Sequence, residues 1–238
     1  MTAQFIGVGV GPGDPELITV KAWRIIGRAD VVCYIANDKG ESQARNIARD
    51  ALRDVTKAQQ EIPILMPFAE NRSAANHVYD NAAITIQREI DAGKTVVFLC
   101  EGDPLFFGSF AYLLERLMPE NECQVVPGIT SVNAAASALQ LPLTMLKESF
   151  SVISGRHTDE QMIDTLNKYD SVVIMKAGLS RPRILKALAT SNRTQDAQYI
   201  EYIGRENERM TTDVSLLEDK AGPYFSLFVV TRQNRDSR

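Results

Sequence analysis

The stretch "CEGDPLFFGSF" (Cys100–Phe110) follows the apolar run Thr95–Leu99, so a buried strand ends directly at a Gly-Asp-Pro step. Aspartate is a favoured residue at a helix N-cap, and proline has the fixed φ of a first helical position. The apolar spacing that follows predicts a helix over 105–118. The stretch therefore indicates a strand, a tight turn and a helix capped by Asp103.

The same Gly-Asp-Pro step occurs a second time near the start of the chain. It lies in "GPGDPELITVKA" (Gly11–Ala22), after the apolar strand Phe5–Val10. Asp14 takes the position that Asp103 has in the first stretch. Two strands are thus expected to end in one kind of turn, with a carboxylate at each following helix start.

Alternating apolar strands and amphipathic helices predict an α/β fold with a parallel sheet in the first half of the chain. The expected strands cover 4–10, 30–35, 62–66, 95–100 and 124–126, and the expected helices 15–28, 42–53, 73–92, 105–118 and 130–139. In the second half, strands are expected at 150–153, 171–175 and 198–203 and helices at 159–168 and 181–190. Shorter strands and turns are expected after Arg209.

A domain boundary is expected in "LQLPLTMLKES" (Leu139–Ser149), which contains Pro142 and loses the helical period. This predicts an N-terminal α/β domain over 1–140 and a mixed α/β domain over 148–238.

The composition is that of an ordinary globular protein, with 45% hydrophobic residues and a formal net charge of −4. Basic residues are spread along the chain, which disfavours nucleic acid and acidic membrane surfaces as partners. The N-terminus does not resemble a secretory signal, and no apolar run is long enough to span a bilayer. A cytoplasmic location is expected.

The cysteines and histidines do not have the spacing of a metal site. Cys33, Cys100 and Cys123 are far apart without a CxxC pair, and His77 and His157 have no cysteine or second histidine near them. We expect reduced structural cysteines and no metal.

The glycine-rich turns lie where ligands bind in α/β proteins, at the carboxyl ends of strands. The dinucleotide motif GxGxxG fails, because its third glycine falls on Pro12 or Asp14, and Gly13 is not followed by the lysine of a P-loop. Carboxylates at helix starts also replace the phosphates that would bind there. A nucleoside cation fits better, and S-adenosylmethionine is the commonest such molecule.

Several motifs in order resemble one family, the tetrapyrrole (cobalamin-pathway) methylases. They are "GVGPGDPELITVKA", "RADVVCY", "EGDPLFFGS", "PGITS" and "VVIMKAG", and together they span essentially the whole chain. Within the family, "CEGDPLFFGSF", "VVIMK" and "PYFSLFVV" look most like the branch that methylates C20 of precorrin-2 or cobalt-factor II. Ile35 stands where uroporphyrinogen-III methylases usually have an aspartate, so that residue's role is not transferred.

The resemblance implies two α/β domains of the tetrapyrrole methylase type, with S-adenosylmethionine in the cleft between them, and usually a homodimer. It implies cofactor contacts by residues of four turns: Glu101, Gly102, Asp103, Phe106, Thr130, Ser131, Met175, Ala177, Tyr202 and Ile203. Pro12 would line the tetrapyrrole side of the cleft.

Methyl transfer to carbon mainly requires alignment of the two reactants, followed by removal of a proton. Glu101, Tyr34 and Asp14 are candidate bases, because they lie at strand ends or turns; solvent or the substrate's own carboxylates are alternatives. The acidic side chains of precorrin-2 call for cations around the cleft. The candidates are Lys39, Arg45, Arg72 and Lys147.

Three other functions stay open. The methyl acceptor could be another tetrapyrrole position, as in uroporphyrinogen-III. A nicotinamide-dependent oxidoreductase is suggested by the glycine-rich first strand and disfavoured by Pro12. A non-catalytic tetrapyrrole carrier would not need the cofactor turns. The residues do not indicate whether the acceptor contains cobalt.

Overall fold

The computed structural model describes residues 4–67 and 72–233. The chain forms two compact units, a first unit (Met1–Ser131) and a second unit (Val132–Arg238). Residues 140–149, where a linker was expected, contain no helix or strand, and helix α5 (Ser131–Leu139) before them falls almost entirely within the second unit.

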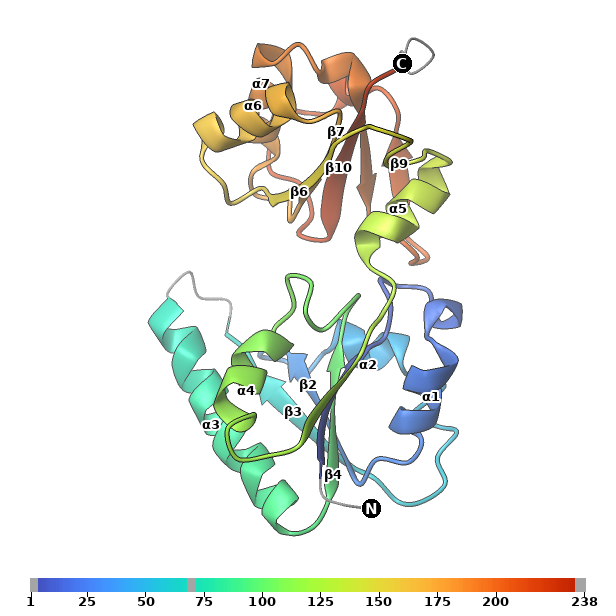
Figure 1. Cartoon of the computed structure of the whole chain (residues 1–238), viewed down its shortest axis with the longest axis vertical. Coiled ribbons are helices and arrows are strands. Elements are labelled where there is room, and N and C mark those ends of the chain that lie inside the picture. The colour runs from blue at the N-terminus through green and yellow to red at the C-terminus, as the bar shows by residue number, and fades with distance from the viewer. Residues whose placement is uncertain (1–3, 68–71, 234–238) are drawn as a thin grey trace. The chain divides into compact units, whose positions relative to one another are not determined.

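The first unit is built around a parallel sheet with the strand order β3-β2-β4-β1-β5 (Figure 1). Its strands are β1 (Gln4–Gly9), β2 (Val31–Ala36), β3 (Gln60–Leu65), β4 (Thr95–Cys100) and β5 (Cys123–Val126). Its helices are α1 (Val20–Ile26), α2 (Gln43–Ile47), α3 (Arg72–Asp91) and α4 (Phe110–Leu117). All five strands therefore end at the same edge of the sheet.

Strand alternation divides the core of this unit into two layers. Val32, Tyr34 and Ala36 of β2 pack on the side of α1 and α2, whereas Val31 and Cys33 pack on the side of α3 and α4. Figure 1 shows the two helix pairs on opposite faces of the sheet. A fully buried aliphatic side chain contributes about 1.5–3 kcal/mol, so these layers hold the sheet and its turns in place.

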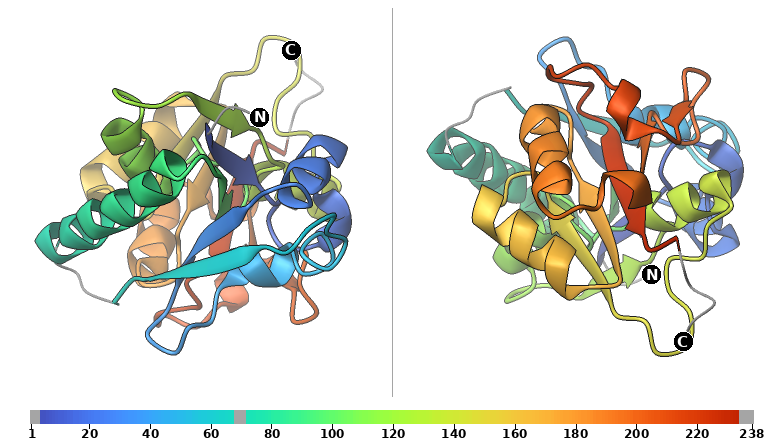
Figure 2. Two further views of the ribbon diagram at one scale, coloured as in Figure 1. Left: turned by 90° about the horizontal axis from the view of Figure 1, so that it is seen from below. Right: turned by 90° about the horizontal axis from the view of Figure 1, so that it is seen from above.

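The second unit contains a mixed sheet with the order β6-β7-β10-β8-β9. Its strands are β6 (Phe150–Ser154), β7 (Ser171–Met175), β8 (Ala197–Glu201), β9 (Arg209–Thr211) and β10 (Ser226–Thr231). Strands β6 and β7 are parallel, and β10 runs antiparallel to both β7 and β8. Helices α6 (Asp159–Lys168) and α7 (Arg181–Thr190) lie side by side on one face of this sheet (Figure 2).

The predicted α/β class is confirmed, and α6, β7 and α7 have the predicted bounds. Three predicted helices were too long. The helix expected over 15–28 is a 3-10 turn (Pro15–Leu17) followed by α1, because Thr19 accepts a hydrogen bond from Ala22 N and caps a new helix. The helix expected over 42–53 ends at Ile47 and continues as turns. The helix expected over 105–118 begins at Phe110.

Among the described residues, none of the helices combines the length and apolar character that crossing a lipid bilayer requires.

Candidate functional site

Two turns of the first unit are joined by backbone hydrogen bonds at the carboxyl edge of the sheet. Gly102 N donates to the carbonyl oxygen of Gly11 at 2.8 Å, and Gly11 N donates to that of Gly102 at 3.4 Å. Val10 N also donates to the carbonyl oxygen of Cys100 at 2.9 Å. The turns after β1 and β4 are therefore one structure.

The turn after β5 lies against the same structure, and glycine is required for the approach. A Cβ atom on Gly128 would lie 2.0 Å from the carbonyl oxygen of Gly102 and 2.8 Å from the Cα atom of Gly9. Gly102 has φ +65° and is more open, since the nearest atom to its own added Cβ would be Thr130 Cα at 3.8 Å. Three predicted turns thus meet at one edge, with open space beside the Cα atom of Gly102.

Asp103 links two of these turns through its carboxylate. Oδ1 accepts a hydrogen bond from Leu105 N at 2.9 Å, and Oδ2 accepts one from Gly128 N at 3.0 Å. Helix α4 begins several residues later, with Ser109 at its N-cap. The predicted capping role of Asp103 is therefore wrong: its carboxylate holds the turn after β4 against the turn after β5.

The other members of the first turn are placed as follows. Asp14 caps the 3-10 turn Pro15–Leu17, with its carboxylate accepting from Glu16 N at 2.8 Å, so its predicted capping role is confirmed. Pro12 is buried, between Gly11 with φ +83° and Gly13.

Glu101 directly follows β4, and the aromatic pair Phe106 and Phe107 continues the same turn. Their rings meet edge to face with centroids 5.1 Å apart. Phe107 has φ +56° and a side chain that is 43% exposed. Thr130 and Ser131 precede and begin helix α5. The cofactor contacts expected of these residues stay predictions.

Tyr34 and Arg45 converge on a residue that the sequence did not single out. Glu61 of β3 forms a bidentate ion pair with Arg45 of α2, at 2.6 Å from Nε and 2.9 Å from Nη2, and accepts from Tyr34 Oη at 2.8 Å. Burial is the main cause that raises the pKa of the Tyr34 phenol, and the hydrogen bond to the Glu61 carboxylate raises it further. Its hydroxyl is thus held as a hydrogen-bond donor to Glu61.

The remaining cations expected to meet substrate belong to three different segments of the chain. Lys39 is exposed in the turn after β2, where its backbone N donates to Asn37 Oδ1. Lys147 is exposed in the turn before β6. Arg72 begins helix α3, and its side chain lies outside the described part of the structure.

The candidate residues of the second unit gather at one edge of its sheet. Ala177 N donates to the carbonyl oxygen of Ser226, and Tyr202 N donates to that of the adjacent Phe225, at 3.1 and 2.8 Å. The ends of β7 and β8 therefore flank the start of β10. Ala177 and Ile203 are buried, whereas Met175 and Tyr202 are half-buried.

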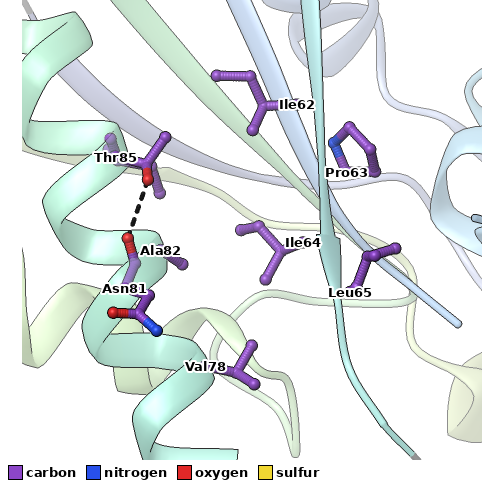
Figure 3. A pocket seen from close by; sticks show the side chains of 9 residues that line it. Ile62, Pro63, Ile64, Leu65, Val78, Asn81, Ala82 and Thr85 are labelled. Atoms are coloured by element: carbon purple, nitrogen blue, oxygen red, sulfur yellow. Dashed lines mark hydrogen bonds between the residues drawn. The ribbon is translucent and has the colours of Figure 1, made fainter. Parts of the chain in front are cut away.

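A groove of about 250 Å³ lies elsewhere, between β3 and α3 (Figure 3). Its lining is apolar except for Asn81 and Thr85, and Thr85 Oγ1 already donates to the carbonyl oxygen of Asn81. None of the predicted site residues lines it. A cofactor with charged groups would find no charged partner there.

Two of the three cysteines are deeply buried in the first unit. Burial raises the pKa of Cys33 to about 12 and that of Cys100 well above its usual range, so both stay protonated. Within residues 4–67 and 72–233, no three His, Cys, Asp or Glu side chains are grouped so that they could hold a metal ion.

Gly9 and Gly128 lie in turns that the sequence identified but were not among the predicted site residues, and Glu61 was not identified at all. A signal existed for Gly128, which follows Pro127 at the end of β5 just as glycines follow β1 and β4. No local signal marks Glu61, because its partners lie 16 and 27 residues away.

Comparison with known proteins agrees with this fold. The model of the Tetrapyrrole (Corrin/Porphyrin) Methylases matches residues 4–218. A Sinorhizobium sp. protein named precorrin-2 C(20)-methyltransferase is 36% identical over 232 residues, covering 95% of this chain and 94% of that protein. A Salmonella typhimurium protein named cobalt-precorrin-2 C(20)-methyltransferase is 30% identical over 235 residues, covering 98% of each.

A solved structure shares the whole architecture. It is the uroporphyrin-III C-methyl transferase from Thermus thermophilus complexed with S-adenyl homocysteine, with a TM-score of 0.68, 22% identity and coverage of 96% of this chain and 97% of that one. At this identity the likeness shows the fold. Together with the family match and the two relatives, it establishes that the chain belongs to the tetrapyrrole (corrin/porphyrin) methylases.

Proposed function

We propose that the protein is an S-adenosylmethionine-dependent methyltransferase that methylates C20 of precorrin-2, or of its cobalt-containing counterpart, in the biosynthesis of the corrin ring of cobalamin. The observation that carries this function is the similarity, along nearly the whole chain, to proteins named for this reaction. The connected turns of the first unit supply an edge for the cofactor, and they lack the motifs of a nicotinamide or nucleotide-phosphate site.

The residues at this edge fit S-adenosylmethionine. There is open space beside the Cα atom of Gly102, because the nearest atom to an added Cβ would be 3.8 Å away, whereas its N–H and carbonyl oxygen are hydrogen-bonded to Gly11. The Asp103 carboxylate of this turn already accepts two backbone hydrogen bonds. The ligand is therefore expected to meet backbone groups and the neighbouring Glu101, Phe106 and Thr130. Backbone carbonyl groups suit the ammonium and ribose hydroxyls of this cofactor.

When bound, S-adenosylmethionine supplies a methyl group on a positively charged sulfur. The main task of the protein is then to hold the acceptor carbon in line with that methyl group. Fixing two reactants in this way is worth about 7–11 kcal/mol of the barrier, so a covalent nucleophile is not required. The rigid backbone links between Gly11, Gly102 and Gly128 suit this positioning role.

After transfer, C20 must lose a proton, and we assign its acceptance to Glu101. This residue directly adjoins Gly102 of the cofactor turn. Tyr34 is a poorer candidate, because its raised pKa keeps the phenol protonated. The hydroxyl donates a hydrogen bond to Glu61 and so cannot accept a proton from C20. Asp14 belongs to the other Gly-Asp-Pro turn, where its carboxylate accepts a hydrogen bond from Glu16 N and caps the 3-10 turn.

We assign the tetrapyrrole side of the site to Pro12 and to the cations Lys39, Arg72 and Lys147. Arg45 is expected to act less directly, since both of its bonds to Glu61 would have to be broken for it to meet a substrate carboxylate. We also propose that the protein works as a homodimer in the cytoplasm.

Anaerobic incubation of the protein with precorrin-2 and S-adenosylmethionine tests the function. The expected product, read by mass spectrometry, is precorrin-2 with one methyl group added, formed only when both reactants are present. Parallel reactions with uroporphyrinogen-III, and calorimetric titrations with S-adenosylhomocysteine and NAD, test the alternatives. Methylation of uroporphyrinogen-III alone, or binding of NAD alone, would contradict the proposal.

A further inference from the structure

The loop between α5 and β6 contains a leucine that is both strained and exposed. Leu146 is 99% exposed, and its backbone has φ +49°. Single exposed leucines are common on protein surfaces, but residues with a Cβ atom rarely adopt this left-handed conformation. Neither the strain nor the exposure stabilises a single chain, so we looked for a contact that the side chain makes with another molecule.

Hydrogen bonds within the loop fix the conformation around Leu146. Glu148 N donates to the carbonyl oxygen of Met145 at 2.9 Å, and Thr144 Oγ1 donates to that of Glu148 at 2.9 Å. The Glu148 carboxylate accepts a further hydrogen bond from Met145 N at 3.0 Å. Met145 is itself 41% exposed. The loop therefore holds two consecutive apolar side chains at the surface in one conformation.

The groove between β3 and α3 has the complementary character. Figure 3 shows Ile62 and Ile64 of β3 directed toward α3, which lines the groove with Val78 and Ala82. Leu65 at the end of β3 is 52% exposed. Because an apolar cavity of about 150 Å³ can hold a benzene molecule, the groove of about 250 Å³ has room for a leucine side chain and part of a methionine.

The free edge of β3 favours an apolar side chain over an added strand. β3 is the outermost strand of its sheet, and Gln60 N and Met66 N donate to the carbonyl oxygens of Asp30 and Ala36 in the direction of β2. The alternation of a parallel ladder then directs the backbone of Pro63 outward. Proline has no N–H to offer to a pairing strand. None of the described residues that line the groove is charged, which disfavours an ionic ligand.

We propose that Leu146 of one copy of the chain inserts into the β3–α3 groove of a second copy. The inference rests on the homodimer of the proposed function and names its contact surfaces. Each copy has both the loop and the groove, so a two-fold dimer contains the same contact twice. The contact removes apolar surface of both partners from water, and the fixed loop loses little conformational entropy on binding.

Cysteine cross-linking tests the contact itself. Leu146→Cys is co-expressed with Asn81→Cys or with Thr85→Cys under a different tag, since Asn81 and Thr85 both line the groove. A disulfide requires Cβ atoms about 3.5–4.5 Å apart, so oxidation should link the two tagged chains only if the loop of one lies in the groove of the other. Wild type, with its own three cysteines, is the control.

Two outcomes of cross-linking would overturn the inference. One is the absence of a linked pair at both groove positions. The other comes from the single chain that carries both Leu146→Cys and Asn81→Cys. A disulfide that forms within this chain, and not between chains, would show that the groove receives the loop of its own copy.

The dimer dissociation constant, measured by sedimentation equilibrium, tests the energy of the contact. Leu146→Asn should raise this Kd at least tenfold, because a buried leucine side chain is lost from each contact. Leu216→Asn is the matched control, since Leu216 is a 76% exposed leucine of the same unit, and it should leave the Kd unchanged. A monomeric wild type, or equal Kd values in Leu146→Asn and wild type, would overturn the inference.

Thermal unfolding and activity separate the contact from folding and from the proposed reaction. Asparagine adopts the left-handed conformation more readily than leucine, so the melting temperature of dilute, monomeric Leu146→Asn should equal or exceed that of monomeric wild type. A lower melting temperature would assign Leu146 to the fold and overturn the inference. A monomeric wild type that methylates precorrin-2 would overturn the inference alone, whereas a cross-linked dimer without this activity would contradict the proposed reaction alone.

Discussion

The two units differ in the residues that follow the carboxyl ends of their strands. In the first unit, the carboxyl edge is made of glycines, and Gly102 and Gly128 lie so close together that a Cβ atom on Gly128 does not fit. In the second unit, Lys176 and Tyr202 occupy left-handed conformations at the corresponding strand ends, with φ +54° and +56°. The first edge has close-packed glycines where its turns meet. The second edge also has such glycines, Gly155 and Gly178, but keeps side chains at two strained positions.

The difference indicates that the two edges bind ligands in different ways. Close-packed glycines give a rigid surface of peptide groups, which can hold a cofactor through its hydrogen-bonding atoms. A strained lysine or tyrosine gives a chemically specific group at a fixed position, at a cost of about 1–2 kcal/mol each. The first edge is therefore expected to depend on shape, and the second on charge and side-chain identity.

The largest expected effect is that of Gly128→Ala, which should destabilise the protein by about 3 kcal/mol or more and abolish binding of S-adenosylhomocysteine. Overpacking against fixed backbone has costs of this order, and the clash here is with the carbonyl oxygen of Gly102 at 2.0 Å. Chemical denaturation and calorimetry measure the two effects. Gly40→Ala is the control, because Gly40 has φ +80° but no atom within 4 Å of the added Cβ. It should cost only about 1 kcal/mol, and equal losses would contradict the packing argument.

Asp103→Ala should have the next largest effect and lower the free energy of unfolding by about 2 kcal/mol. The substitution leaves Leu105 N and Gly128 N without the carboxylate that joins them, and an unmade hydrogen bond to a charged group costs about 1.5–3 kcal/mol. The affinity for S-adenosylhomocysteine should fall with it. Asp103→Asn keeps one acceptor oxygen. It should recover part of the lost stability, measured by denaturation, and part of the lost affinity, measured by titration. Equal cofactor affinity in Asp103→Ala and wild type would show that the turn is not part of the cofactor site.

Phe107→Gly tests the exception in the first unit, where a strained side chain lies among the glycine turns. The change should raise the free energy of unfolding by about 1 kcal/mol, because glycine adopts φ +56° without strain and the ring is 43% exposed. Phe107→Ala keeps the Cβ atom and should give no gain. Denaturant midpoints distinguish the two, and a loss in Phe107→Gly would mean that the contact with Phe106 outweighs the strain.

The smallest effect is expected at the opposite, amino-terminal edge of the first sheet. Asp30 there pairs with Lys57 and accepts a hydrogen bond from Thr95 N at 2.9 Å, and these two bonds, that of Lys57 more than that of Thr95, lower the pKa of its carboxyl group. A lowered pKa stabilises the fold above the pKa of the unfolded chain, and this contribution disappears as the pH falls below about 4. At a third exposure it is worth about 1 kcal/mol or less.

Comparing Asp30→Asn with wild type across the pH range isolates that contribution. The variant should be less stable at neutral pH, and the difference in unfolding free energy should shrink as the solution is acidified. A difference that stays constant down to pH values below about 3 would show that the Asp30 carboxylate is not the titrating group.

Much of the fold follows from local patterns, and the failures have a common cause. Helices α6 and α7 were predicted with their full bounds, since each has a clear apolar period and a recognisable start. The helix expected from Leu105 failed because Phe107 is left-handed and Asp103 is held by Gly128, which is distant in the sequence. Local propensity does not contain such long-range contacts.

Prediction of the candidate site from local sequence patterns has the same limit. The turns at Gly11 and Gly102 were identified from their motif, and the structure joins them directly. Glu61, which holds both Tyr34 and Arg45, lies on another strand and has no motif around it. Tyr34 was singled out as a possible base because its strand is recognisable, whereas its hydrogen-bond partner is set by the pairing of β2 with β3.

The most direct test of the account is to locate the transferred methyl group. Precorrin-2 is incubated with the protein and S-adenosylmethionine carrying an isotope-labelled methyl group, and the product is examined by NMR spectroscopy. The proposed function predicts a single labelled methyl group bonded to C20. A label at another ring carbon would contradict the assignment within the family, and an unlabelled tetrapyrrole would contradict the methyltransferase function.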